Sequence, residues 1–136
     1  MKRHAPQVRE FMTHLPVEAE RCETAGDAET TMQKHGIGHL PVMSGSHLRG
    51  IVSQHDLLRA RLRLGDRFGG TALEDVCTTD VLTVSPVDPI DDVVRKLLAT
   101  DADSAVVIDS GFVVGIFTTT DALRFIAQFF GGSPPT

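Results

Sequence analysis

Two stretches of the chain share one pattern, Gly50-Ile51-Val52-Ser53-Gln54-His55-Asp56 and Gly115-Ile116-Phe117-Thr118-Thr119-Thr120-Asp121. In each, a glycine and two apolar residues end a predicted strand, and Ser/Thr-x-x-Asp then opens a predicted helix. Each residue of the second stretch lies 65 positions after its counterpart, as Gly115 does after Gly50. The residue classes match at this offset without a gap from about Val8 through Arg59. Because loops usually absorb insertions, an ungapped match of this length indicates a duplicated unit.

The second copy has the clearer periodicity. Its first helix is predicted from one apolar face, made of Ile90, Val93, Val94, Leu97 and Leu98. Residues 105–108 and 112–117 predict two strands joined by a tight Asp-Ser-Gly turn. A second helix is predicted from Leu123, Ile126, Ala127 and Phe130.

The first copy repeats this order more weakly. Ala28, Met32 and His35 predict its first helix, residues 39–43 and 48–52 its strands, and residues 56 to about 64 its closing helix. Short extended segments at 16–18 and 81–83 precede the two first helices. Each copy therefore reads β-α-β-β-α, and the predicted fold class is α/β (α+β), with tandem repeats related by a pseudo-two-fold axis, small sheets packed together and helices outside.

The predicted boundaries are 1–64 for the first copy, 65–72 for a linker, 73–130 for the second copy and 131–136 for a tail. The glycines of the linker predict flexibility, and the Gly-Gly-Ser-Pro-Pro-Thr tail predicts disorder. One unit of this size buries little core by itself, which explains why two units come paired.

Composition limits the partners of the 136-residue chain. A net charge of −5 argues against nucleic acid as the main partner, because phosphate backbones attract basic surfaces. No apolar run approaches the roughly 18 residues that a membrane span needs. Residues 1–6 carry charge but no apolar segment, so no secretory signal is expected. Cys22 and Cys77 are too few for a disulfide framework, so a cytoplasmic protein is expected. The basic cluster of Arg59, Arg61, Arg63 and Arg67 reads as a solvated helix face followed by a linker.

Neither catalysis nor a metal site is predicted. His35, His39, His47 and His55 are spread over a helix, two strands and a loop, without an acidic or cysteine partner at metal-binding spacing. Ser53 and His55 form no recognisable nucleophile-base pair, and a nucleophile elbow is missing. The chain is therefore not expected to be an enzyme, and no cofactor is expected as a catalyst.

The pattern resembles the CBS domain, named after cystathionine β-synthase, which occurs in pairs called Bateman modules. The family signature is a Pro-Val strand, a turn, and Gly-apolar-apolar-Ser/Thr-x-x-Asp/Asn. Pro41-Val42 begins it in the first copy, whereas Val106 replaces the proline in the second. The resemblance covers nearly the whole chain and implies two clefts between the repeats for adenosyl ligands such as AMP, ADP, ATP or S-adenosylmethionine.

The resemblance also implies roles for individual residues. In the first site Asp56 takes the ribose hydroxyls, Ser53 reaches the phosphate, and the other expected residues are Gly38, His39, Leu40, Pro41, Val17, His55 and Arg59. In the second site Asp121 and Thr118 take these roles, with Asp103, Ser104, Ala105, Leu82, Thr83, Thr120 and Arg124 around them. The chemistry fits, since a carboxylate accepts from two vicinal hydroxyls and a helix N-terminus attracts phosphate.

Two main functions stay open at this point, and an enzyme or a metal-dependent protein is a third option. As a sensor, the chain binds an adenine nucleotide, forms a homodimer and signals to an unknown effector protein. As a scaffold, it keeps empty clefts, and Ser53-x-x-Asp56 and Thr118-x-x-Asp121 serve only as capping boxes. The first site is favoured for phosphate, because Asp101 and Asp103 of the second repel a polyphosphate.

Overall fold

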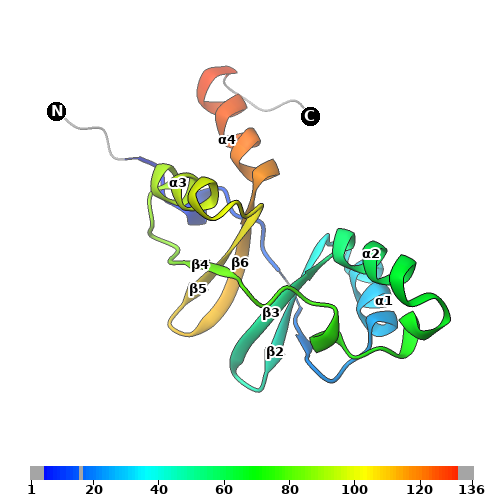
Figure 1. Cartoon of the computed structure of the whole chain (residues 1–136). Helices are drawn as coiled ribbons and strands as arrows, with labels where there is room; N and C mark the ends of the chain where they lie inside the picture. Colours follow the sequence, from blue (N-terminus) through cyan, green and yellow to red (C-terminus); the bar gives the residue numbers. More distant parts are fainter. Residues whose placement is uncertain (1–4, 16, 132–136) are drawn as a thin grey trace. The chain divides into compact units, whose positions relative to one another are not determined.

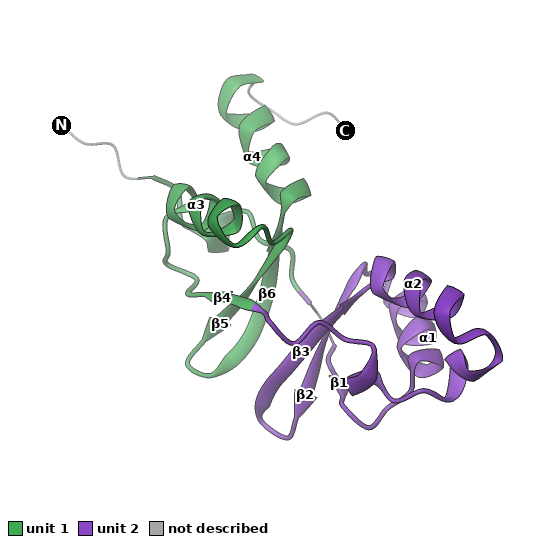
Figure 2. Ribbon diagram, in the orientation of Figure 1, with its two compact units in different colours: residues 1–14, 82–136 green, residues 15–81 purple. Residues whose placement is uncertain are grey.

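The chain forms two compact units, shown in different colours in Figure 2. In this computed structural model, residues 5–15 and 17–131 are described. Unit 2 is Leu15–Val81, and unit 1 combines Met1–His14 with Leu82–Thr136. Across the described residues, no helix is long and apolar enough to cross a membrane.

Unit 2 holds one three-stranded sheet and two long helices (Figure 1). In chain order its elements are β1 (Ala19–Glu20), α1 (Ala25–His35), β2 (His39–Ser44), β3 (His47–Ser53), α2 (Gln54–Leu64) and the 3-10 helices η2 (Gly65–Gly70) and η3 (Leu73–Asp75). The strand order is β1-β2-β3, with β1 parallel and β3 antiparallel to β2.

Unit 1 repeats this arrangement. Its elements are the 3-10 helix η1 (Val8–Glu10), β4 (Leu82–Val84), α3 (Ile90–Thr100), β5 (Ser104–Asp109), β6 (Phe112–Thr118) and α4 (Thr119–Gly131). The strand order is β4-β5-β6, again with one parallel and one antiparallel pair. The predicted β-α-β-β-α order and the α/β class are therefore confirmed in both copies. The predicted extended segment at 81–83 falls on β4, whereas β1 begins later than predicted and Pro16 lies outside the described residues.

The duplication extends to an irregularity in the strand pairing. In the β2–β3 hairpin the register shifts between Val42 and Met43. In the β5–β6 hairpin it shifts between Val107 and Ile108, which are the counterparts of those residues. Since a shift of this kind bends and twists a hairpin, both copies carry the same local distortion.

The apolar helix faces are only partly used for the cores. The predicted amphipathic helix is confirmed as α3, in which Ile90, Val93 and Leu97 are buried and Leu98 is 77% exposed. The helix predicted from Leu123, Ile126, Ala127 and Phe130 is confirmed as α4, but Leu123 and Ile126 are exposed and do not reach the core. The half-buried Ala122 and Phe125 pack on the core of unit 1 in their place. A helix packs only one stripe against its own core, and a helix with more apolar residues than that leaves the others on its surface.

The expectation of a flexible linker is wrong. Residues 65–70 form η2, whose Phe68 is 3% exposed and belongs to the core of unit 2. The Arg61 guanidinium lies 4.3 Å from the centre of the Phe68 ring, a cation–π contact. One buried aromatic side chain is therefore enough to hold a glycine-rich segment that composition alone marks as mobile. The predicted tail begins at Gly131, which ends α4, and its other residues lie outside the described residues.

The first described segment packs with unit 1. Val8 is fully buried in the core of that unit, and Thr13 pairs with Ile116 of β6. Its counterpart Thr78 pairs in the same way with Ile51 of β3, in unit 2. The boundaries of the compact units therefore differ from those of the two sequence copies. The boundaries of the two copies stay a prediction.

Candidate functional site

The first candidate site is built around the junction of β3 and α2. Ser53 ends the strand and caps the helix, because its Oγ accepts from the Asp56 backbone N–H at 3.1 Å. In return, the Ser53 N–H donates to Asp56 Oδ2 at 2.9 Å. His39 of β2 lies opposite Ser53, and the Gly38 carbonyl accepts from the Gln54 N–H at 3.0 Å. The structure therefore brings Gly38, His39, Ser53 and Asp56 together at one end of the sheet.

Asp56 borders a hollow on the surface of unit 2. The hollow has a volume of about 360 Å³ and is lined by Asp56, Arg59, Ala60, Arg63 and Val76. The Asp56 side chain is 10% exposed, and its Oδ1 accepts from the Arg59 guanidinium at 2.7 Å. The Arg59 side chain is 75% exposed, so the guanidinium is free to turn toward a ligand. The hollow thus presents one carboxylate and two guanidinium groups.

The counterpart junction in unit 1 has the same cap and a more crowded carboxylate. The Asp121 N–H donates to Thr118 Oγ1 at 3.2 Å, and Asp121 Oδ2 accepts from the Thr118 N–H at 2.9 Å. Asp121 Oδ1 accepts from the Thr13 hydroxyl at 2.9 Å and from Arg124 at 3.3 Å. Asp121 is 2% exposed. The Thr119 N–H donates to the Asp103 carbonyl at 3.1 Å, which repeats the bond of the first site.

The remaining predicted site residues differ in how much of each side chain is exposed. Leu40, Pro41 and Ala105 have buried side chains, so a ligand could meet only their backbone. Val17 and Leu82 are half-buried and pack against the two cores. His55, Thr83 and Thr120 are exposed, and Ser104 lies opposite Thr118 across the β5–β6 pair. Of the predicted first-site residues, Asp56 and Arg59 line the hollow.

Two residues that lie at the candidate sites were not predicted from the sequence. Arg63 lines the hollow with Arg59, and the signal was available, because Asp56, Arg59 and Arg63 are spaced to share one helix face. Thr13 was missed because it meets Asp121 across 108 positions of sequence. Arg61, predicted as part of a solvated face, instead serves the fold through Phe68 and Glu29.

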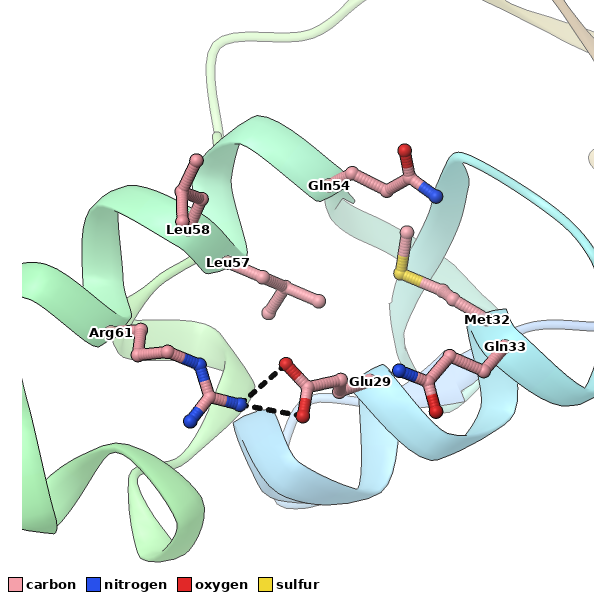
Figure 3. Close-up of a pocket in the computed structure, with 7 residues that line it drawn as sticks. All are labelled: Glu29, Met32, Gln33, Gln54, Leu57, Leu58 and Arg61. Atoms are coloured by element: carbon pink, nitrogen blue, oxygen red, sulfur yellow. Dashed lines mark hydrogen bonds and ion pairs between the residues drawn. The ribbon is translucent and has the colours of Figure 1, made fainter.

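A groove between the two helices of each unit shows how the copies have diverged. In unit 2 a groove of about 170 Å³ runs between α1 and α2, and Figure 3 shows Arg61 reaching the Glu29 carboxylate beside it. Both Glu29 oxygens lie 2.6 Å from the Arg61 guanidinium nitrogen. In unit 1 the corresponding groove measures about 510 Å³, and Val94 stands at the counterpart of Glu29. Ile126 stands at the counterpart of Arg61, so this groove has no ion pair to close it.

Among ionisable groups, Cys77 is perturbed. Burial raises the pKa of its thiol, which lies beside β3 and donates weakly to the Glu74 carbonyl. A raised pKa keeps a thiol protonated at neutral pH and so makes it a poor nucleophile. Within residues 5–15 and 17–131, no three His, Cys, Asp or Glu side chains gather as they would around a metal ion.

Comparison with known proteins identifies the repeated unit. The family model described as "CBS domain" matches residues 8–63 and again residues 73–128. The L-aspartate semialdehyde sulfurtransferase of Methanocaldococcus jannaschii is 28% identical over 134 residues, which cover 97% of this chain and 25% of that protein. The chain spans less than half the length of the first curated relatives it matches, so the alignment leaves most of each of those proteins uncovered.

Solved structures agree with this assignment. The CBS domain pair of protein MJ0100, in complex with 5′-methylthioadenosine and S-adenosyl-L-methionine, superposes with a TM-score of 0.79 at 25% identity, covering 92% of this chain and 98% of that one. CBSX2 in complex with AMP superposes with a TM-score of 0.71 at 28% identity, covering 90% of this chain and 97% of that one. Two matches of the family model, on two copies of one β-α-β-β-α unit, show that the chain belongs to the CBS domain family and carries its domains as a tandem pair.

Proposed function

We propose that this protein is a regulatory module that binds a phosphate-bearing adenosine nucleotide at Asp56 and signals its occupancy to an effector protein. The observation that carries the proposal is the hollow of unit 2, where the Asp56 carboxylate stands beside Arg59 and Arg63. Its volume of about 360 Å³ lies within the roughly 300–1,000 Å³ of small-molecule sites. Related pairs solved with AMP or with S-adenosyl-L-methionine support an adenosyl ligand.

The charges of the hollow favour a nucleotide over S-adenosylmethionine. A carboxylate accepts hydrogen bonds from both hydroxyls of a ribose, and guanidinium groups bind phosphate in bidentate geometry. S-adenosylmethionine carries a positive sulfonium, which two guanidinium groups repel. The positive end of the α2 helix dipole adds a further preference for an anion. We therefore place the ribose at Asp56 and the phosphate between Arg59 and Arg63.

Titration calorimetry with AMP, ADP, ATP, S-adenosylmethionine and adenosine tests this assignment. We expect AMP to bind at least tenfold more tightly than adenosine, because a hydrogen bond to a charged group contributes about 1.5–3 kcal/mol. The advantage of AMP should shrink as salt rises, since the guanidinium groups are solvent-accessible. Equal affinity for AMP and adenosine would contradict the role of the arginines. Failure of every compound to bind would contradict the sensor function itself.

Signalling requires that the ligand has a different affinity for two states of the protein. We propose that a bound phosphate draws the Arg59 guanidinium away from Asp56 Oδ1, so that the free and bound states differ in this ion pair. A reducing, cytoplasmic location is part of the proposal and is supported by the free thiols of Cys22 and Cys77.

A second candidate function is a ligand-free scaffold. It is favoured by the capping boxes, since Asp56 and Asp121 both accept the N–H of the residue that caps their helix. Under this alternative both carboxylates stabilise helix ends and bind nothing else. The two functions differ in what happens to nucleotide affinity when Asp56 is changed.

We further propose that the protein is a homodimer that associates through the α3/α4 face. This face consists of the exposed apolar residues Leu98, Leu123, Ile126, Phe129 and Phe130 and the groove beside them. The fold does not require an apolar residue at each of these positions, because the counterpart of Ile126 in unit 2 is Arg61, which forms an ion pair with Glu29. A two-fold dimer places one surface against its own copy, and an apolar face makes that contact without like-charge repulsion.

Leu123→Glu is expected to weaken self-association at least tenfold, because burying a leucine contributes about 1.5–3 kcal/mol. Sedimentation velocity over a range of concentrations measures the change. Leu58→Glu is the matched control, since Leu58 is the counterpart of Leu123 on α2 and is also exposed. A wild-type monomer at all concentrations, or equal dissociation of both variants, would contradict the α3/α4 face as the dimer surface.

A further inference from the structure

We infer that each chain binds one nucleotide, at Asp56, because Thr13 closes the counterpart position at Asp121. This inference rests on the proposed function and concerns the number of sites. The two aspartates occupy the same place in the repeat, yet they differ in how much hydrogen-bonding capacity they have left for a ribose. That difference is visible within each unit by itself.

The Asp121 carboxylate is saturated. A carboxylate has about four acceptor positions on its two oxygens. Oδ2 accepts from the Thr118 N–H at 2.9 Å and from the Thr118 hydroxyl at 3.1 Å. Oδ1 accepts from the Thr13 hydroxyl at 2.9 Å and from Arg124 at 3.3 Å. With these four donors in place and only 2% of the residue exposed, two ribose hydroxyls find no acceptor there.

The Thr13 hydroxyl is held in this position by its backbone. The Thr13 N–H donates to the Ile116 carbonyl at 2.8 Å, and the Ile116 N–H donates to the Thr13 carbonyl at 2.8 Å. A Cβ on the neighbouring Gly115 would meet the Thr13 carbonyl oxygen at 2.8 Å, so the two segments lie in close contact. Thr13 therefore acts as a fixed donor whose release would require opening this pairing.

Asp56 is open by comparison. Oδ2 accepts from the Ser53 N–H at 2.9 Å, and Oδ1 accepts from Arg59 at 2.7 Å, so two donors are in place and the Asp56 side chain is 10% exposed. Thr78, the counterpart of Thr13, pairs with Ile51 through the same two backbone bonds. Among the described residues, however, the Thr78 side chain donates no hydrogen bond to Asp56. Two acceptor positions are therefore available for a ribose.

The positively charged side chains near the two aspartates also favour a nucleotide at Asp56 over one at Asp121. Arg59 has a counterpart in Arg124, but Arg63 corresponds to Gln128, a neutral side chain. A phosphate at the second position would thus meet one guanidinium in place of two. Thr13 and Gln128 together make the second copy a poor nucleotide site, with Thr13 as the residue that determines whether Asp121 is available.

Titration calorimetry of the whole protein with AMP and ATP measures the number of sites. We expect the wild type to bind one equivalent of nucleotide per chain. Asp56→Asn should weaken this binding at least tenfold, whereas Asp121→Asn should keep an affinity within twofold of the wild type. Thr13→Val removes the hydroxyl while keeping the side-chain shape, and we expect it to add a second, weaker event. Thr13→Ser keeps the hydroxyl and should stay at one equivalent.

The possible results separate this inference from the proposed function. Two equivalents in the wild type, or loss of the event in Asp121→Asn, would overturn the single-site assignment and leave the nucleotide function standing. One equivalent in Thr13→Val would overturn the role of Thr13. No saturable binding of AMP or ATP by any of the proteins would overturn the proposed function, and with it the count of one.

Discussion

Asp56→Asn is expected to weaken AMP binding ten- to a hundredfold while lowering the free energy of unfolding by about 1 kcal/mol or less. The affinity falls because asparagine loses the charge that strengthens two hydrogen bonds to the ribose, each worth about 1.5–3 kcal/mol when charged. The stability changes little because the amide oxygen of asparagine still accepts from the Ser53 N–H, as Asp56 Oδ2 does at 2.9 Å. Titration calorimetry and urea unfolding measure the two effects.

Asp27 offers a control for Asp56, because it closes a capping box of the same kind but does not line the hollow. It closes a capping box with Thr24 at the start of α1, where the Asp27 N–H donates to Thr24 Oγ1 at 3.1 Å and the Thr24 N–H donates back to its carboxylate at 3.2 Å. Asp27→Asn should therefore match Asp56→Asn in stability and bind AMP like the wild type. If both variants bind AMP as tightly as the wild type, Asp56 acts only as a helix cap, and this result would support the scaffold function.

Gly50→Ala is expected to lower the free energy of unfolding by about 2–3 kcal/mol. An alanine Cβ at this position would collide with the backbone carbonyl oxygen of Thr78 and would lie 3.0 Å from Cys77 Sγ. The two segments cannot separate cheaply, because the Ile51 N–H donates to the Thr78 carbonyl at 2.9 Å and the Thr78 N–H donates back at 2.8 Å. Forcing extra atoms into a packed contact typically costs about 1–3 kcal/mol. Equilibrium urea unfolding measures the loss.

Gly69→Ala is the matched control for this substitution. No atom lies within 4 Å of a Cβ placed on Gly69, and its backbone is not in the left-handed region. Alanine there should leave stability unchanged or raise it by about 0.4–1 kcal/mol, because it restricts the unfolded chain. Equal stability of Gly50→Ala and Gly69→Ala would show that β3 and the segment at residues 77–78 separate without cost, contrary to the packing described here.

Close packing against another segment therefore explains why each repeated stretch begins with a glycine. At Gly115 a Cβ would meet Met12 Sδ and the Thr13 carbonyl oxygen, each at 2.8 Å. In both copies the glycine lets another segment of the chain, residues 77–78 at Gly50 and residues 12–13 at Gly115, lie close enough to the strand to pair with it. At Gly115 this pairing also delivers Thr13 to Asp121, so the glycine influences the second site through packing and touches no ligand.

The sequence by itself was enough to predict the repeated β-α-β-β-α unit and its capping boxes. Both depend on residues a few positions apart, such as Ser53 and Asp56 or Thr118 and Asp121, whose geometry a helix start dictates. The constant offset between the copies then carried the prediction from one to the other. The contribution of individual residues to ligand binding stays a prediction, because their chemistry fits both a cap and a ribose site.

Only the tertiary structure decided which apolar residues form the core and how the two aspartates differ. Leu97 and Leu98 are equally apolar, yet one is buried and the other is 77% exposed, since burial depends on what packs against the helix. The glycine-rich segment at 65–70 is ordered because Phe68 finds a core and Arg61 covers its ring. Thr13 reaches Asp121 across 108 positions, and a contact of that length depends on chain topology, which no local pattern records.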